Sequence, residues 1–174
     1  MQIKRNQILN VMLFVYVTVG LLILFFDLGK KHFGIYFSEK INQFVPSILP
    51  TAAITPMPES SALILSLAWL MVPIIAVVIW LNADWDRLYS SEFSKKISGW
   101  LVLGIFVLLP ILIVFMIFNV PSAEDTGRSG RFLYTYLNEF KLFIIVYGAG
   151  IWLTFSAGIF TTLAITKLSL FKKV

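Results

Sequence analysis

Four stretches of this chain contain no Asp, Glu, Lys or Arg, namely 6–26, 60–83, 97–123 and 142–166. Each holds about 21 residues or more, and a helix that rises about 1.5 Å per residue crosses a hydrocarbon core of about 30 Å in that length. Only 13% of the residues are charged and the mean hydropathy is +0.88, unlike a soluble domain. We therefore predict an all-α fold, an integral membrane four-helix bundle. It forms a single membrane domain over residues 1–174, with transmembrane helices at about 7–27, 61–82, 97–118 and 141–166.

The first stretch begins like a secretory signal peptide, because Lys4 and Arg5 precede it. Its apolar part, 8–26, is longer than the hydrophobic region of a signal peptide. Asp27 and two lysines follow it in place of small residues at a cleavage site. We therefore expect a signal anchor that is retained in the mature protein.

The distribution of Lys and Arg predicts the orientation of the helices. Eight of the 14 lie on the side that holds both termini and the 82–96 loop, within about 30 residues, against six within about 57 on the other side. Because cytoplasmic segments are enriched in Lys and Arg, both termini are predicted to be cytoplasmic. These residues are spread over the helix flanks, which favours contact with membrane lipids and argues against nucleic acid.

The uncharged stretches argue against several classes of protein. Ion-coupled transporters and pumps usually carry an ionisable residue within the membrane, and none lies in these stretches. They also contain neither a Ser with a His nor a pair of Asp residues, so we expect no enzyme and no catalytic residue. The single histidine, His32, lies just outside the first stretch, and the chain has no Cys. We therefore expect no metal and no cofactor.

Polar and helix-breaking residues inside the stretches are expected to act in packing. Pro73 and Pro110 each remove a helical hydrogen bond and should kink their helices. Hydroxyl groups in membrane helices bond across helices or to their own backbone. We predict this for Thr18, Ser66, Thr154, Ser156, Thr161 and Thr162.

The last stretch has a face of small residues. Gly150, Thr154 and Gly158 repeat every four positions, and Ala157 and Thr161 widen the same face. Small residues at this spacing let another helix approach closely. Two uses of the face remain open: it closes the bundle on itself, or it accepts a helix from a partner.

The first outer loop is predicted to contain an amphipathic interfacial helix. Between residues 30 and 45, apolar side chains recur at helical spacing, as expected for a helix at a membrane surface: Phe33, Phe37, Ile41 and Phe44, with Tyr36 beside them. Four prolines follow between residues 46 and 58. We expect them to exclude a regular helix and to enforce extended or turn structure.

The second outer loop begins as a polar, turn-rich stretch over 119–131, where Gly127 and Gly130 space Arg128 and Arg131. An aromatic run follows before the last span. Exposed arginines beside aromatic residues are typical of contact with lipid headgroups and also of protein interfaces. Both interpretations stay open.

Two local motifs accompany this order of features. The first is F-V-P-S-I at 44–48, preceded by E-K-I-N at 39–42, and the second is T-G-R-S-G-R-F at 126–132. With cytoplasmic termini, a short basic cytoplasmic loop, two longer outer loops and F-K-K at 171–173, the chain resembles the colicin A-type immunity proteins. These are small four-helix inner-membrane proteins that protect a bacterium against its own pore-forming bacteriocin.

The resemblance implies a protein of the bacterial inner membrane that binds the membrane-inserted helices of a bacteriocin channel domain and prevents channel opening. It implies helix contact through Gly150, Thr154 and Gly158, and contact or shaping on the periplasmic side through Pro46, Ser47, Arg128 and Arg131. Two alternatives share the same sequence features. One is a phage or plasmid exclusion protein, and the other is an accessory subunit of a larger membrane complex.

Overall fold

The structure is a computed structural model that describes residues 5–83 and 128–170, with single positions at 85, 111, 114, 117, 118 and 120. Within this part of the chain every regular element is a helix, which confirms the all-α prediction there. The helices are α1 (Arg5–Phe25), η1 (Leu28–Lys30), α2 (His32–Asn42), α3 (Ile48–Ala53), α4 (Pro58–Leu81), α8 (Arg128–Glu139) and α9 (Phe143–Leu170).

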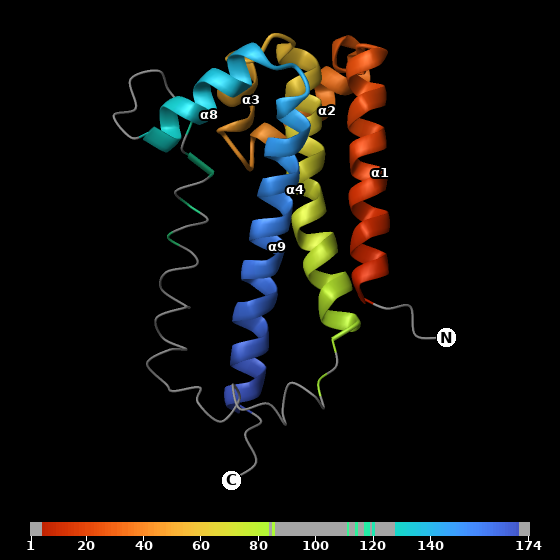
Figure 1. The fold of residues 1–174 in the computed structure, drawn as a ribbon, viewed down its shortest axis with the longest axis vertical. Helices are drawn as coiled ribbons and strands as arrows, with labels where there is room; N and C mark the ends of the chain where they lie inside the picture. Colours follow the sequence, from red (N-terminus) through yellow and green to blue (C-terminus); the bar gives the residue numbers. More distant parts are fainter. Residues whose placement is uncertain are drawn as a thin grey trace.

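Three of these helices are long and apolar enough to cross a membrane, over Gln7–Phe25, Pro58–Leu81 and Phe143–Lys167. They coincide with three of the four predicted spans and support a membrane protein. The predicted span at 97–118 lies outside the described residues, apart from four single positions. α1, α4 and α9 lie side by side, and the short elements η1, α2, α3 and α8 gather at one end of them, here called the cap end (Figure 1).

α4 lies between α1 and α9, and its buried residues repeat at helical spacing. Ile64, Ala68, Val72 and Ile75 are all almost fully buried, and α9 contributes Trp152 to the same core. One stripe of each helix therefore packs against its neighbours. The opposite surfaces are apolar and exposed, as expected where lipid replaces water.

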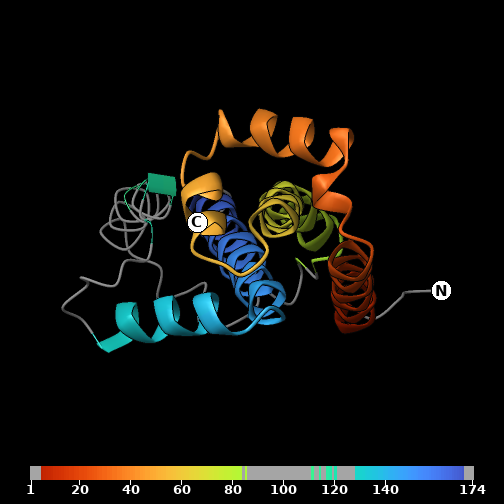
Figure 2. The same ribbon diagram turned by 90° about the horizontal axis from the view of Figure 1, so that it is seen from above.

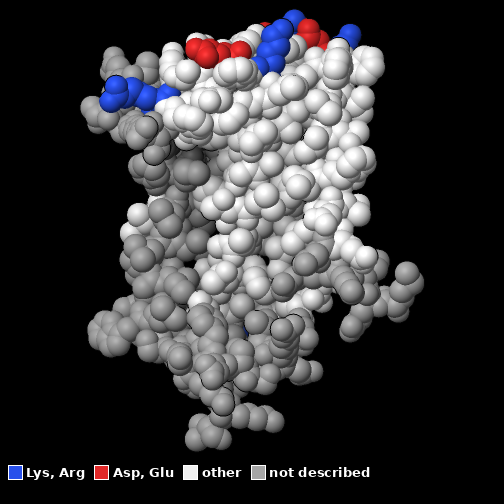
Figure 3. Space-filling model, viewed as in Figure 1, with Lys and Arg blue, Asp and Glu red and all other residues white. Residues whose placement is uncertain are grey.

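Charge is confined to the ends of the described bundle. The charged side chains on the visible face gather at the cap end, above a mostly uncharged surface (Figure 3). At the opposite end, the Lys167 Nζ lies 3.8 Å from the ring centroid of Trp85 and 5.2 Å from that of Trp80. This cation–π cluster joins the last turns of α9 to the end of α4, where indole rings usually mark a membrane interface.

Pro73 lies inside α4, which continues past it to Leu81. The Ser156 hydroxyl of α9 donates a 2.9 Å hydrogen bond to the Val72 carbonyl beside this proline. Ser66 bonds instead to a carbonyl of its own helix, as do Thr161 and Thr162. The packing role predicted for these four hydroxyls is confirmed. Pro110 lies outside the described residues.

The proline-rich segment after α2 is more helical than predicted. α3 contains Pro50 as its third residue, and α4 begins with Pro58 as its first. The expectation that prolines exclude regular helix here is wrong for these two positions. The first turn of a helix leaves its N–H groups without intrahelical partners, so a proline there loses no hydrogen bond.

Candidate partner-binding surfaces

α9 carries glycines on two faces, and only one of these faces packs against the described helices. Gly150 and Thr154 are exposed and Gly158 is half-buried. Apart from the adjoining turns of α9, no atom of the described residues lies within 4 Å of where a side chain at Gly150 would begin. The predicted face therefore points away from α1 and α4. It does not close the bundle onto the described helices.

Gly148 provides the close helix contact instead. A Cβ at this position would overlap the Tyr16 hydroxyl of α1 and lie 3.2 Å from the Ala68 Cβ of α4. Tyr16 and the fully buried Trp152 meet edge to face, with ring centroids 6.0 Å apart. The sequence interpretation missed Gly148, although its spacing of four to Trp152 was the available signal.

Pro46 and Ser47, predicted to act at the periplasmic surface, separate in the fold. Pro46 is exposed, whereas Ser47 is buried and precedes α3. The Ser47 backbone N–H donates a 3.0 Å hydrogen bond to the Ile117 carbonyl. Ser47 therefore ties the first outer loop to the region of the predicted third span, and Pro46 alone remains available at the surface.

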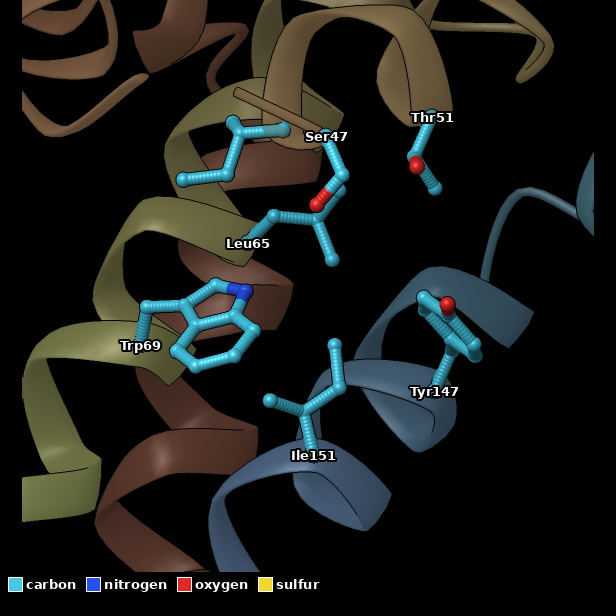
Figure 4. A pocket seen from close by; sticks show the side chains of 7 residues that line it. Ser47, Thr51, Leu65, Trp69, Tyr147 and Ile151 are labelled. Carbon is cyan, nitrogen blue, oxygen red and sulfur yellow. The ribbon is translucent and has the colours of Figure 1, made fainter. Parts of the chain in front are cut away.

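Ser47 also lines a small pocket between α3, α4 and α9. Figure 4 shows Ser47, Trp69 and Ile151 pointing toward one another from three parts of the chain. Thr51 and Tyr147 add hydroxyl groups to the rim. The pocket has room for about one water molecule. It is too small for an organic ligand, and its lining residues form a packing contact between these helices.

Arg128 and Arg131 lie one turn apart at the start of α8, and Arg131 is exposed. The turn-rich structure predicted up to residue 131 is wrong from Arg128 onward, because the helix includes Gly130. Docking through Leu137, which is buried, compensates for the weak helix preference of a glycine in the first turn.

A polar cluster fixes the end of α1 to α4. Asp27 has a left-handed backbone (φ 49°, ψ 40°) and pairs with Lys30 at 2.8 Å. The Ser60 hydroxyl donates a 3.3 Å hydrogen bond to the other Asp27 oxygen. The hydrogen bond from Lys30 lowers the pKa of the Asp27 carboxyl. Gly29 sits beside this cluster, directly against the backbone of Glu59 and Ser60.

No three His, Asp or Glu side chains of the described residues come together as metal ligands. The surfaces that remain are therefore candidates for contact with proteins or lipids. Comparisons of the chain with protein-family models, with curated proteins and with solved structures find no match.

Proposed function

We propose that this chain is an immunity protein of the bacterial inner membrane, which protects the producing cell from its own pore-forming bacteriocin. It binds helices of the inserted channel domain and keeps the channel from opening. The observation that carries the proposal is the small-residue face of α9 that none of the described helices covers, where Gly150 and Thr154 are exposed. A long, otherwise apolar helix with such a face is suited to lateral contact with a foreign helix.

The depth of this face suits a target that is already inserted. At about 1.5 Å per residue, Gly150 lies about 10 Å below the start of α9, and Gly158 lies about 22 Å below it. The face therefore extends over about 12 Å in the middle part of a hydrocarbon core of about 30 Å. Gly150 lets a partner backbone approach closely, and the Thr154 hydroxyl offers that backbone a hydrogen bond.

We further propose a fourth span at 97–118 in the same bundle. α4 ends at the end of the bundle opposite the cap end, whereas α8 begins at the cap end (Figure 1). The chain between them must therefore return along the length of the bundle, and it contains the uncharged stretch 97–123. Four spans leave both termini in the cytoplasm and place the cap end, with α2 at the membrane interface, in the periplasm.

Survival of a sensitive bacterium that expresses the chain tests the proposal. Cells are challenged with a panel of pore-forming bacteriocins, including the toxin encoded beside the gene, while the membrane potential is recorded. We expect protection against one toxin, with the potential retained. Killing by every toxin, despite confirmed expression in the membrane, would overturn the proposal and favour an accessory subunit; protection against phage or conjugating donors would favour an exclusion protein.

Two sets of variants locate the contact. Gly150→Leu and Thr154→Leu place bulk on the exposed face, and we expect survival to fall to that of cells without the protein. Thr18→Leu, at an exposed position of α1, is the matched control and should protect fully. Arg128→Ala combined with Arg131→Ala tests the periplasmic contact and should reduce protection at unchanged protein level. Equal protection by all variants would exclude both surfaces.

A further inference from the structure

The side chains of α8 fall into three arcs. A helix turns by about 100° per residue, so Phe132, Tyr136 and Phe140 lie within one narrow arc. The buried Leu137 lies about a quarter turn away and docks the helix on the bundle. A third arc is exposed and polar, with Arg131, Thr135, Asn138 and Glu139.

The aromatic arc forms a continuous ladder of rings that leads onto a membrane span. Ring centroids lie 4.2 Å apart for Phe132 and Tyr136, and 5.2 Å apart for Tyr136 and Phe140. Tyr136 also contacts Phe143, the first residue of α9, at 5.3 Å. Phe132 and Phe140 are each 51% exposed. The ladder is therefore ordered by contacts within itself and is left uncovered on its outer side.

The connection to α9 sets the depth of this ladder. Only residues 140–142 separate the two helices, and the Phe140 N–H still bonds to the Tyr136 carbonyl as in a helix. The exposed Lys141 lies in this connection. Because α9 is apolar from its first residue, α8 must lie at the level where the hydrocarbon core begins.

α2 repeats the three arcs of α8. Gly34 and Ser38 are buried against the bundle, and the stacked rings of Phe33 and Phe37 lie about a quarter turn away, in the same rotational sense as in α8. His32, Glu39 and Gln43 form an exposed polar arc. Of the apolar stripe predicted for this helix, Phe37 and Ile41 pack partly against the core. Phe33 and Phe44 are exposed.

The directions of the two helices fix where their aromatic arcs face. Seen from above, α2 and α8 run along opposite sides of α4 and α9 and in opposite directions (Figure 2). In both helices the buried arc faces inward, and the helices run in opposite directions. Because α-helices are right-handed and the order of the arcs is the same, both aromatic arcs point in the same direction, along the spanning helices and away from the cap end.

We propose that α8 and α2 are a pair of interfacial helices, which insert their aromatic arcs into the headgroup region of one leaflet from opposite sides of the bundle. The buried arc of each helix then contacts protein, the aromatic arc contacts lipid, and the polar arc faces water. Aromatic residues at this depth are typical membrane anchors. The proposal rests on the bilayer placement given above and is independent of the toxin. It assigns α8 a lipid surface.

Spin labels can test this directly, because the chain has no cysteine. Single variants Phe132→Cys, Tyr136→Cys and Phe140→Cys are labelled in the full-length protein and reconstituted in vesicles of phosphatidylcholine and phosphatidylglycerol. Collision with oxygen, which partitions into the bilayer, is compared with collision with a water-soluble nickel chelate. We expect oxygen to exceed nickel at all three positions. Thr135→Cys and Asn138→Cys, on the polar arc, should show the reverse ratio.

Two results would overturn the proposal. Nickel accessibility that is equally high on both arcs would place the ladder in water, free for a soluble protein partner. Low accessibility to both reagents would mean that protein, such as a second copy of the chain, covers it. Phe33→Cys repeats the measurement on α2, and monodisperse elution of each variant confirms its fold. If the chain protects cells against no toxin, the immunity proposal fails, but these accessibility ratios are unchanged. The two proposals can therefore be refuted independently of each other.

Discussion

Replacing Gly29 by alanine tests the closest backbone contact at the cap end. The added Cβ would lie closer than 3.0 Å to the Glu59 carbonyl and the Ser60 nitrogen, whereas ordinary contact begins at 3.4 Å. The gap between η1 and the first turn of α4 must therefore open by more than the 0.4 Å between these two distances. The obstructing atoms are backbone, so no rotamer change relieves the overlap. The backbone at Gly29 is not left-handed, and the effect is therefore purely steric.

Adding a methyl group to a packed site lowers the free energy of unfolding by about 1–3 kcal/mol. For Gly29→Ala we expect a decrease of about 2–3 kcal/mol, because the polar cluster of Asp27 and Ser60 must move with the backbone. At about 2–4 °C per kcal/mol for a chain of this size, Tm should fall by about 4–12 °C. The measurement is loss of the monodisperse peak in size-exclusion chromatography after heating the protein purified in detergent.

Gly150→Ala is the matched control, with the same chemical change and an open site. Apart from the adjoining turns of α9, no described atom lies within 4 Å of the new Cβ. Alanine is favoured over glycine in a helix by about 1 kcal/mol. Tm should stay level or rise by about 2–4 °C. Equal Tm values for wild type and Gly29→Ala would refute the steric argument. A large fall for Gly150→Ala would show that this face is already packed.

Three further outcomes are expected. Gly148→Ala should lower Tm because the new Cβ overlaps the Tyr16 hydroxyl. Adding Tyr16→Phe to this variant removes the hydroxyl and should restore part of the lost Tm, and the same assay compares the double variant with both single variants. Ser156→Ala removes a hydrogen bond between helices and should cost about 0.6 kcal/mol, or about 1–2 °C; Ser66→Ala, which removes only a bond to its own helix, should cost less. The pKa of Asp27 is lowered by the hydrogen bond from the neighbouring lysine, so its stabilisation is present above the ordinary pKa near 3.9 and is lost as the pH falls through the lowered value. Tm measured from about pH 5 to pH 2 should therefore fall more steeply for wild type than for Asp27→Asn, and parallel curves would contradict this.

The sequence predicted the long helices well, because a charged group in hydrocarbon is so costly that uncharged stretches mark the spans. Three of them occur close to the predicted positions, and the helix over His32–Asn42 also lies where the spacing of apolar residues indicated. The prediction of the proline segment was weaker. The low helix propensity of proline applies to the interior of a helix. Proline is tolerated in the first turn, and the sequence did not show that Pro50 lies there.

The candidate surfaces show where sequence reasoning stops. Spacing identified small residues on α9, yet it could not tell Gly150, which is open, from Gly148, which receives Tyr16 of a helix more than 100 residues earlier. Ser47 was predicted to shape or contact the periplasmic side, and the sequence did not show that it is buried by neighbours from α4 and α9. A residue's partners on other helices are set by long-range packing, which a local pattern does not contain.

Residues 128–139 show the same division most clearly. Their sequence alone predicted a polar turn followed by an aromatic run, because Gly and polar residues lower the helix preference of a short segment. The tertiary structure decided that this segment is α8, since Leu137 docks on the bundle and stabilises it. The sequence by itself determined which segments can enter a membrane, through the cost of burying charge. Only the tertiary structure decided which faces of those segments meet protein and which are left for lipid or a partner, because that depends on neighbours distant in the chain.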